Sequence, residues 1–387
     1  MKFCLQNIPH LEIDPAFSSE REWLDHLRML AELPYPSLAL MPSILPIVRQ
    51  RVPCKFGGFG WTDAQLQPLA FMSEQTNLRA YRWWASNLEV AFRIFPLREQ
   101  WEDRGEGVRE RCARPDFEAL DFYEEVFASQ GVRWLAVAPV AIADGERRGF
   151  LSAYRQKAAG PFADEEQTSL QHAVDALAML DSKNNPLSAL PTSDMKAVAE
   201  TNLLIQADGS MSARSQEGAR LIYLLGGANM HSLEWARPDW LALPDTVREA
   251  TQRLFEHDAG EIRQRLRIDQ PWGRFDFFLE KLPHHSDAAG AVVAVSLRYF
   301  EAVDITVARR LAGWPLSPRE KRIVVAGARN PNLAQLAQAL GITINTLKSY
   351  NKEMVDRLGI GSRQELIEAL LSDDAAQYDL CYPGHSA

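Results

Sequence analysis

The chain has 387 residues, of which 46% are hydrophobic and 24% charged, a length and composition that suit on the order of two to four globular domains and exclude disorder and collagen-like repeats. It contains no run of the ~20 consecutive apolar residues that a membrane span needs and no Cys-x-x-Cys pair among its four cysteines, so we expect a cytoplasmic protein without disulfides or a membrane partner. The net charge of −9 excludes a chain that coats nucleic acid along its whole length, but residues 314–372 contain eight Lys/Arg against five Asp/Glu and form a local basic segment.

The first 182 residues mix patterns typical of helices and strands. In chain order, the patterns predict a helix at residues 20–33, strands at 47–53, 134–142 and 149–155, a turn at 160–162 and a helix at 164–180. The closing strand, turn and helix resemble the end of a GAF sensory domain. This resemblance implies a GAF-like domain over residues 1–182.

Aromatic side chains are dense between residues 81 and 101 of this first unit. Tyr81, Trp84, Phe92 and Phe95 recur at helical spacing, which is typical of an ordinary core helix. Alternatively, these rings line a pocket for a small-molecule effector, because such pockets are mostly apolar. The four aromatic residues are therefore candidate ligand-binding residues.

Turn-forming residues at 183–196 predict a linker before a second unit at residues 197–310. Within that unit, the patterns predict a strand at 202–206, a tight turn at Asp208-Gly209, a short helix at 216–225 and an antiparallel pair of strands at 273–282 and 291–298. This order resembles a PAS domain without the signature of a bound cofactor. No cofactor is expected.

Four short helices are predicted within residues 311–375, followed by a tail at 376–387. Their predicted caps are Ser317, Asn332, Thr343 and Ser362, with Pro318 in the first turn and Glu320 closing a capping box on Ser317. Gly341 and Gly359 are predicted to end the second and third helices. The segment is therefore expected to be all-α.

The third of these helices, residues 343–358, has two different faces. At about 100° per residue, one side carries Asn345, Lys348, Ser349 and Lys352, with Thr346 at its edge, and the other carries Leu347, Met354 and Leu358. Amide, hydroxyl and ammonium groups are suited to phosphates and base edges. The plain alternative is a helix face that is merely solvated.

The motifs Leu316-Ser317-Pro318-Arg319-Glu320, Leu340-Gly341-Ile342, Asn345-Thr346-Leu347-Lys348-Ser349 and Arg357-Leu358-Gly359 resemble the LuxR-type helix-turn-helix. The resemblance implies that the third helix lies in the major groove of DNA. It implies DNA contacts from Asn345, Thr346, Lys348, Ser349 and Lys352, with Thr343 and Asn332 at the starts of the two helices of the motif.

Four positions depart from the family pattern. Asn330-Pro331 occupies a turn where Gly and an aliphatic residue are usual, but Asn tolerates a left-handed backbone, so the turn is expected to form. Ala334 replaces a common basic residue and Tyr350 a common His. Phosphate contacts from these two positions are therefore not implied.

The sequence thus predicts α+β sensory domains, GAF-like and then PAS-like, followed by an all-α four-helix LuxR-type helix-turn-helix domain. No phosphate-binding loop, nucleophile elbow or set of metal ligands occurs, so we expect neither an enzyme nor a metal site. We expect a homodimer on double-stranded DNA, because one module reads too few base pairs. The sensory domains are expected to bind a small-molecule effector or, alternatively, a protein partner.

Overall fold

The computed structural model describes most of the chain in separate stretches. They are residues 17–63, 68–74, 79–80, 83, 86–87, 109–110, 117–141, 148–180, 195–215, 218, 221–222, 224–225, 243–256, 263–270, 272, 273–282, 291–330 and 332–372. These residues form two five-stranded antiparallel sheets and a set of C-terminal helices. The observed order of mixed α/β parts followed by helices agrees with the predicted fold class.

The first sheet has the strand order β2-β1-β5-β4-β3. Its strands are β1 (Phe56–Thr62), β2 (Pro68–Ser73), β3 (Arg109–Glu110), β4 (Trp134–Ala141) and β5 (Arg148–Arg155). One face packs against α2 (Ser37–Arg49) and α6 (Asp164–Ala176), and α1 (Glu20–Ala31) packs against these two helices. The other face carries an aromatic cluster that includes Phe56, Phe117, Phe122 and Phe127. The predicted helices at 20–33 and 164–180 and the strands at 134–142 and 149–155 are confirmed.

The strand predicted at residues 47–53 is wrong. Residues up to Arg49 belong to α2, which contains Pro42 and Pro46 and whose residues from Ser37 to Val48 are all buried. A helix that is apolar on every side has no 3.6-residue period. The β-branched residues Ile47, Val48 and Val52 therefore suggested a strand.

The second sheet has the strand order β7-β6-β10-β9-β8. Its strands are β6 (Met195–Gln206), β7 (Met211–Arg214), β8 (Arg263–Gln270), β9 (Gly273–Leu282) and β10 (Val292–Ala302), and α8 (Asp245–Glu256) packs against β9 and β10. The turn at Asp208-Gly209 is confirmed, with a φ of 80° at Gly209 and a hydrogen bond from the Ser210 amide to the Asp208 carboxylate. The strands predicted at 202–206, 273–282 and 291–298 are confirmed.

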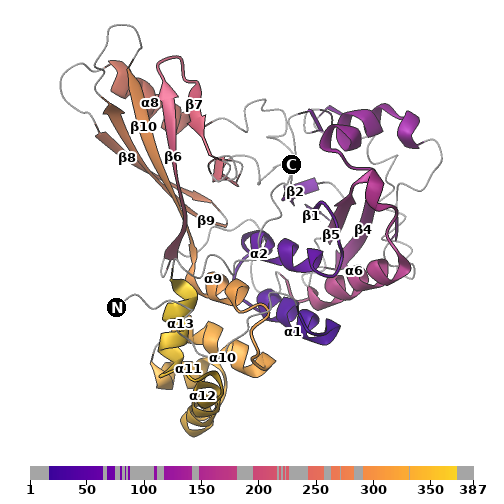
Figure 1. Ribbon diagram of the computed structural model, residues 1–387, viewed down its shortest axis with the longest axis vertical. Helices are drawn as coiled ribbons and strands as arrows, with labels where there is room; N and C mark the ends of the chain where they lie inside the picture. The colour runs from indigo at the N-terminus through magenta and orange to yellow at the C-terminus, as the bar shows by residue number, and fades with distance from the viewer. Residues whose placement is uncertain are drawn as a thin grey trace.

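Strand β10 continues directly into the helix α9 (Val303–Arg310), which is largely buried. Figure 1 places the two sheets on separate sides of the molecule and the C-terminal helices at its lower end, with α1, α2 and α9 where these parts meet. A turn containing Gly313, with a φ of 78°, separates α9 from the helices that follow. Helix α9 is thus a central connecting element.

Four helices follow this turn, and we call residues 316–372 the four-helix module. They are α10 (Pro318–Arg329), α11 (Leu333–Ala339), α12 (Ile344–Leu358) and α13 (Arg363–Leu371). The predicted caps are confirmed, because the side chains of Ser317, Asn332, Thr343 and Ser362 each accept a backbone hydrogen bond in the first turn of their helix. Gly341 and Gly359 have the left-handed φ values of 63° and 66°.

The turn between α10 and α11 differs from the expectation. Asn330 has a φ of −123° and a ψ of 81°, so it does not use the left-handed backbone. Its side-chain amide instead donates a hydrogen bond of 3.1 Å to the Ala326 carbonyl. The turn therefore depends on a side-chain bond to the end of α10.

Within the described stretches, none of the helices is long and apolar enough to cross a membrane.

Candidate nucleic-acid interface

Helix α12 is held in the four-helix module by its apolar face. Leu347 is buried in a small core with Ile323 of α10 and Leu336 of α11. Met354 and Leu358 are 1% and 2% exposed and join the main core. The predicted apolar side of the helix is thus confirmed.

The opposite face of α12 carries the polar residues that the sequence singled out. Asn345, Thr346, Lys348, Ser349 and Lys352 are all exposed. Within the described part of the chain, the Asn345 amide and the two ammonium groups have no hydrogen-bond or ion-pair partner. These groups are therefore available to a partner molecule, whereas their contact with DNA stays a prediction.

Three hydroxyl groups of this region already make hydrogen bonds within α12 or its cap. The Thr343 hydroxyl accepts a hydrogen bond of 3.1 Å from the Thr346 amide and lies 2.8 Å from the Thr346 hydroxyl. The Ser349 hydroxyl donates to the Asn345 carbonyl at 3.3 Å. Thr343 and Thr346 therefore stabilise the start of α12, next to its exposed polar face.

Asn332 occupies the equivalent place at the start of α11. Its side-chain oxygen accepts hydrogen bonds from the amides of Ala334 at 2.8 Å and Gln335 at 3.3 Å. Its side chain is exposed, and a contact of its amide nitrogen with a phosphate stays a prediction. Tyr350, by contrast, packs against the small core of the module.

Several basic side chains of the module are engaged in ion pairs. Arg357 pairs with Glu320 at 2.6 Å, Lys321 with Glu22 of α1 at 3.0 Å, and Arg322 with Glu32, the C-cap residue of α1, at 2.9 Å. Burial raises the pKa of Glu320, but hydrogen bonds from Ser317 and Arg357 outweigh it and hold that pKa below its ordinary value. These basic side chains are thus paired with carboxylates, so the positive charge that the segment presents to a partner is smaller than its composition indicates.

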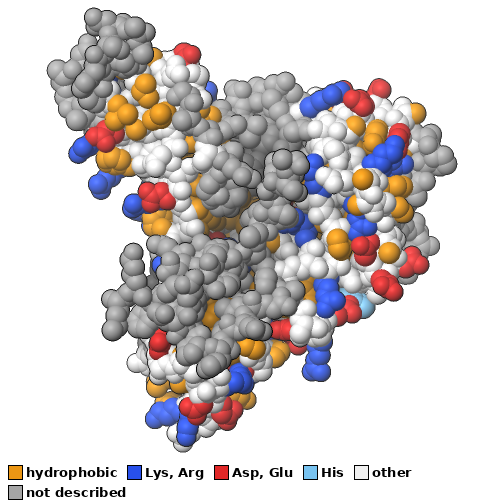
Figure 2. Space-filling model, viewed as in Figure 1, with side chains coloured by type: hydrophobic (Ala, Val, Ile, Leu, Met, Phe, Trp, Pro, Cys, Tyr) orange, Lys and Arg blue, Asp and Glu red, His pale blue; other side chains and the backbone are white. Residues whose placement is uncertain are grey.

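The surface around α12 carries charges of both signs. Figure 2 shows blue Lys/Arg side chains beside red Asp/Glu side chains at the lower end of the molecule, where α11 and α12 lie. Glu353 and Asp356 of α12 are exposed, but they follow the stretch that contains Lys348. The exposed side of α12 that holds Asn345, Lys348 and Lys352 is therefore not part of a uniformly basic surface.

The ion pairs between α1 and α10 were not predicted. The two members of each pair lie 299 and 290 residues apart in the chain. Helical spacing and capping are local signals, so neither indicates a contact over such a separation. From the sequence, Lys321 and Arg322 were predicted only to belong to a basic segment.

A groove of about 700 Å³ lies on the outer face of the second sheet. Its lining includes Glu200, Arg265, Asp276, Phe278, Arg298 and Phe300. Arg298 pairs with Glu200 at 2.9 Å, and Arg265 lies 5.6 Å from the centre of the Phe278 ring. The groove is thus open, aromatic at its base and lined with charges of both signs.

A buried ion pair lies at the edge of the first sheet. The Nε atom of Arg49 is 2.8 Å from an Oε atom of Glu74, and the Gly57 amide donates to the same carboxylate at 2.6 Å. Burial raises the pKa of Glu74 to about 7 despite these contacts. It also raises the pKa of the nearby Cys54 thiol to about 12, which makes a reactive thiolate unfavourable there.

The candidate effector residues Tyr81, Trp84, Phe92 and Phe95 lie outside the described residues. Within the described ranges, no group of three or more His, Cys, Asp or Glu side chains is arranged to hold a metal ion.

No family model and no curated protein matches the chain. Among solved structures, the chain is similar to Escherichia coli SdiA, with 13% identity, 83% of this chain and 84% of that chain covered, and a TM-score of 0.26. It is also similar to SdiA in complex with octanoyl-rac-glycerol, with 12% identity, 94% and 89% coverage and a TM-score of 0.27. The sensor region of a sensor histidine kinase matches at 17% identity over 43% of this chain and 63% of that chain, with a TM-score of 0.18. These TM-scores are too low to support an inference about fold or function.

Proposed function

We propose that the chain is a DNA-binding transcriptional regulator, in which GAF-like and PAS-like sensory domains control a dimeric LuxR-type helix-turn-helix module. The observation that carries this proposal is the outer face of α12, where Asn345, Lys348 and Lys352 are exposed while the opposite face is packed. The partner is double-stranded DNA. Catalysis and a bound cofactor form no part of the proposed function.

The shape of α12 suits the major groove. An α-helix with its side chains is about 10–12 Å wide, and the major groove of B-DNA is about 12 Å wide. Asn345 and Ser349 lie one helical turn apart, as do Lys348 and Lys352. Amide groups recognise adenine edges, and ammonium groups contact guanine or phosphate. One face of α12 therefore combines groups suited to base recognition with groups suited to binding the DNA backbone.

The sensory domains act in this proposal by binding a small-molecule effector. Such a ligand shifts the balance between two states of the chain only if it binds one of them more tightly. A protein partner is the second candidate, favoured by the open groove on the second sheet. Its paired charges around Phe278 and Phe300 are more typical of a protein-binding surface than of an enclosed apolar pocket.

Selection of DNA sequences from a random pool by the full chain tests the proposal. We expect an enriched motif whose preference is lost in Asn345→Ala, while affinity for random DNA is largely retained, because the amide reads bases and carries no charge. Gln206→Ala, which removes an exposed amide from the second sheet, is the matched control. No enrichment with the wild-type chain, or an unchanged motif with Asn345→Ala, contradicts the assignment of α12.

A further inference from the structure

The first helix of the N-terminal unit contacts the first helix of the four-helix module. Lys321 Nζ of α10 lies 3.0 Å from Glu22 Oε1 of α1. Arg322 donates two hydrogen bonds of 2.9 Å to Glu32, the residue that ends α1. One carboxylate thus lies in α1 and the other at its C-cap, and both cations come from consecutive residues of α10.

The Lys321 ammonium group is enclosed in this contact. Its side chain is only 4% exposed, and burial lowers its pKa, against the opposing effect of Glu22. Removal of one member of a buried ion pair is strongly destabilising, because it leaves the other charge without compensation. The contact between α1 and α10 therefore depends on the charge of Glu22.

Helix α9 is attached to the four-helix module through side chains at both of its ends. Arg310 donates hydrogen bonds of 2.7 Å and 3.1 Å to the carbonyls of Leu370 and Ser372 at the end of α13. Asp304 lies 3.6 Å from the guanidinium group of Arg329 at the end of α10. Together with the packing of α10 and α13 against α9, these bonds join α9 and the module in one body.

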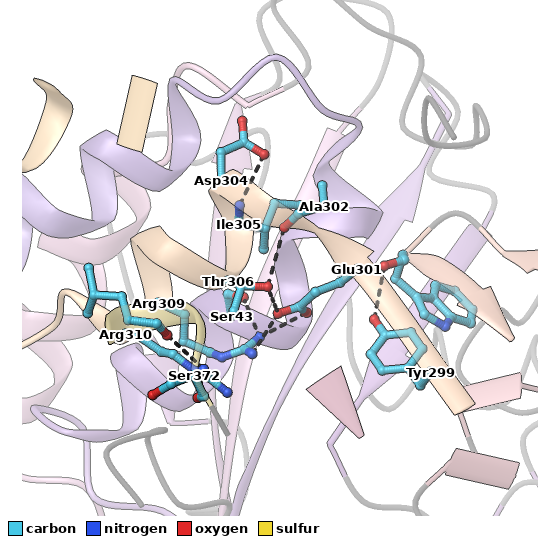
Figure 3. A network of polar contacts seen from close by, with 12 residues as sticks. Ser43, Tyr299, Glu301, Ala302, Asp304, Ile305, Thr306, Arg309, Arg310 and Ser372 are labelled. Atoms are coloured by element: carbon cyan, nitrogen blue, oxygen red, sulfur yellow. Dashed lines mark hydrogen bonds and ion pairs between the residues drawn. The ribbon is translucent and has the colours of Figure 1, made fainter. Parts of the chain in front are cut away.

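Polar contacts link this body to the N-terminal unit and to the second sheet. Arg309 of α9 pairs with Glu301 of β10 at 2.6 Å and donates to the Ser43 hydroxyl of α2 at 3.4 Å. Thr306 donates to the same Glu301 carboxylate at 2.7 Å. Figure 3 shows these side chains converging on Glu301 at the junction of β10 and α9.

We propose that the contact of α1 with α10 is a releasable dock, and that its release is the step by which the N-terminal unit controls the four-helix module. This inference rests on the proposed function, because it names the regulation of the same DNA-binding face. In the docked state Lys321 and Arg322 are neutralised by Glu22 and Glu32. Release frees the side chains of Lys321 and Arg322 from their carboxylates and moves the four-helix module away from the acidic N-terminal unit. Because DNA is negatively charged, the docked state is the weaker DNA-binding state.

The dock combines two ion pairs with apolar packing, since buried residues of α1 and α10 belong to one hydrophobic core cluster. Ion pairs that must be desolvated contribute little net free energy compared with apolar side chains of similar size. A ligand or partner changes the populations of the docked and released states only if it binds one of them more tightly than the other.

Hydrogen exchange of the full-length chain tests the dock directly. In Glu22→Gln we expect amide exchange in α10 to become about tenfold faster, because Lys321 loses its carboxylate. Exchange in α6 is expected to stay unchanged, which distinguishes release from unfolding of the N-terminal unit. The double variant Glu22→Gln with Lys321→Met also removes the ammonium group that has lost its carboxylate. We therefore expect this variant to restore slow amide exchange in α10.

Glu20→Gln is the matched control for this experiment. Glu20 lies on the same helix but contacts His172 of α6 at 2.6 Å, within the N-terminal unit. We expect wild-type exchange in α10 for this variant. Unchanged exchange in Glu22→Gln, or equal acceleration in Glu20→Gln, overturns the dock.

Binding to a random-sequence DNA duplex tests the regulatory role. Glu22→Gln is expected to bind about three- to tenfold more tightly than the wild type and to show a steeper salt dependence. Faster exchange with unchanged DNA affinity overturns the regulatory role. If neither chain binds DNA, the proposed function fails together with that role, whereas the exchange data still decide whether the dock exists.

Discussion

The Tyr35 hydroxyl donates a hydrogen bond of 2.7 Å to the carboxylate of Asp304, which lies 269 residues later in the chain. Asp304 is 1% exposed, and it also lies 3.6 Å from Arg329. Burial raises the pKa of Asp304 above its ordinary value, and these two partners oppose that rise. One carboxylate therefore joins the N-terminal unit, α9 and α10.

We expect Tyr35→Phe to lower the free energy of unfolding by about 1–3 kcal/mol, because it leaves a buried carboxylate short of a donor. The measurement is urea unfolding of the full chain. Tyr123→Phe is the control, since the Tyr123 hydroxyl has no hydrogen bond within the described residues. Equal effects of the two variants contradict a role for the Tyr35 bond.

The buried Glu74 predicts a pH dependence of stability. Its pKa of about 7 in the folded chain lies above the ordinary value of 4.5, so the folded state holds a proton that the unfolded state has lost between these values. The free energy of unfolding is therefore expected to fall by about 1–3 kcal/mol from pH 5 to pH 8. Unfolding of Glu74→Gln at the same two pH values checks this, because the variant lacks the titrating group. A wild-type slope in Glu74→Gln assigns the dependence to other groups.

Lys348→Ala is expected to weaken DNA binding and to reduce the slope of log affinity against log salt by about one unit, since one phosphate contact is lost. Fluorescence anisotropy over a range of salt concentrations measures both effects. Lys157→Ala removes an exposed lysine of the N-terminal unit and serves as the control. An unchanged slope removes Lys348 from the phosphate contacts.

We expect two copies of the chain on each DNA site, because a single recognition helix reads too few base pairs for useful specificity. Native mass spectrometry of the complex with a selected sequence counts the subunits directly. A strict one-to-one complex contradicts the dimer. Extra mass retained by the chain would in addition identify the chemical class of an effector.

The features that could be predicted from the sequence are local ones. The caps Ser317, Asn332, Thr343 and Ser362 were predictable because each acts on amides within its own first turn. The exposed and buried sides of α12 followed from the helical period alone. The predicted polar residues of α12 therefore lie on the side where they were expected.

Elements set by distant parts of the chain could not be predicted. Helix α2 is enclosed on all sides and so has no polar face to mark its period. Strand β8 was missed, although it alternates Arg263, Arg265 and Arg267 on its exposed side with half-buried residues, a local pattern that is typical of a strand. The pair of Glu22 and Lys321 depends on how two units pack, for which no local pattern exists.

The direct passage from β10 into α9 has a mechanical consequence. β10 ends at Ala302 and α9 begins at Val303, so no flexible loop absorbs displacement between them. A slide of β10 along its own length by one residue, about 3.3 Å, moves the first turn of α9 by a similar distance. The second sheet and α9 are thus joined without an intervening loop, and a displacement of β10 is passed to α10 and α13 through the packing of these two helices against α9.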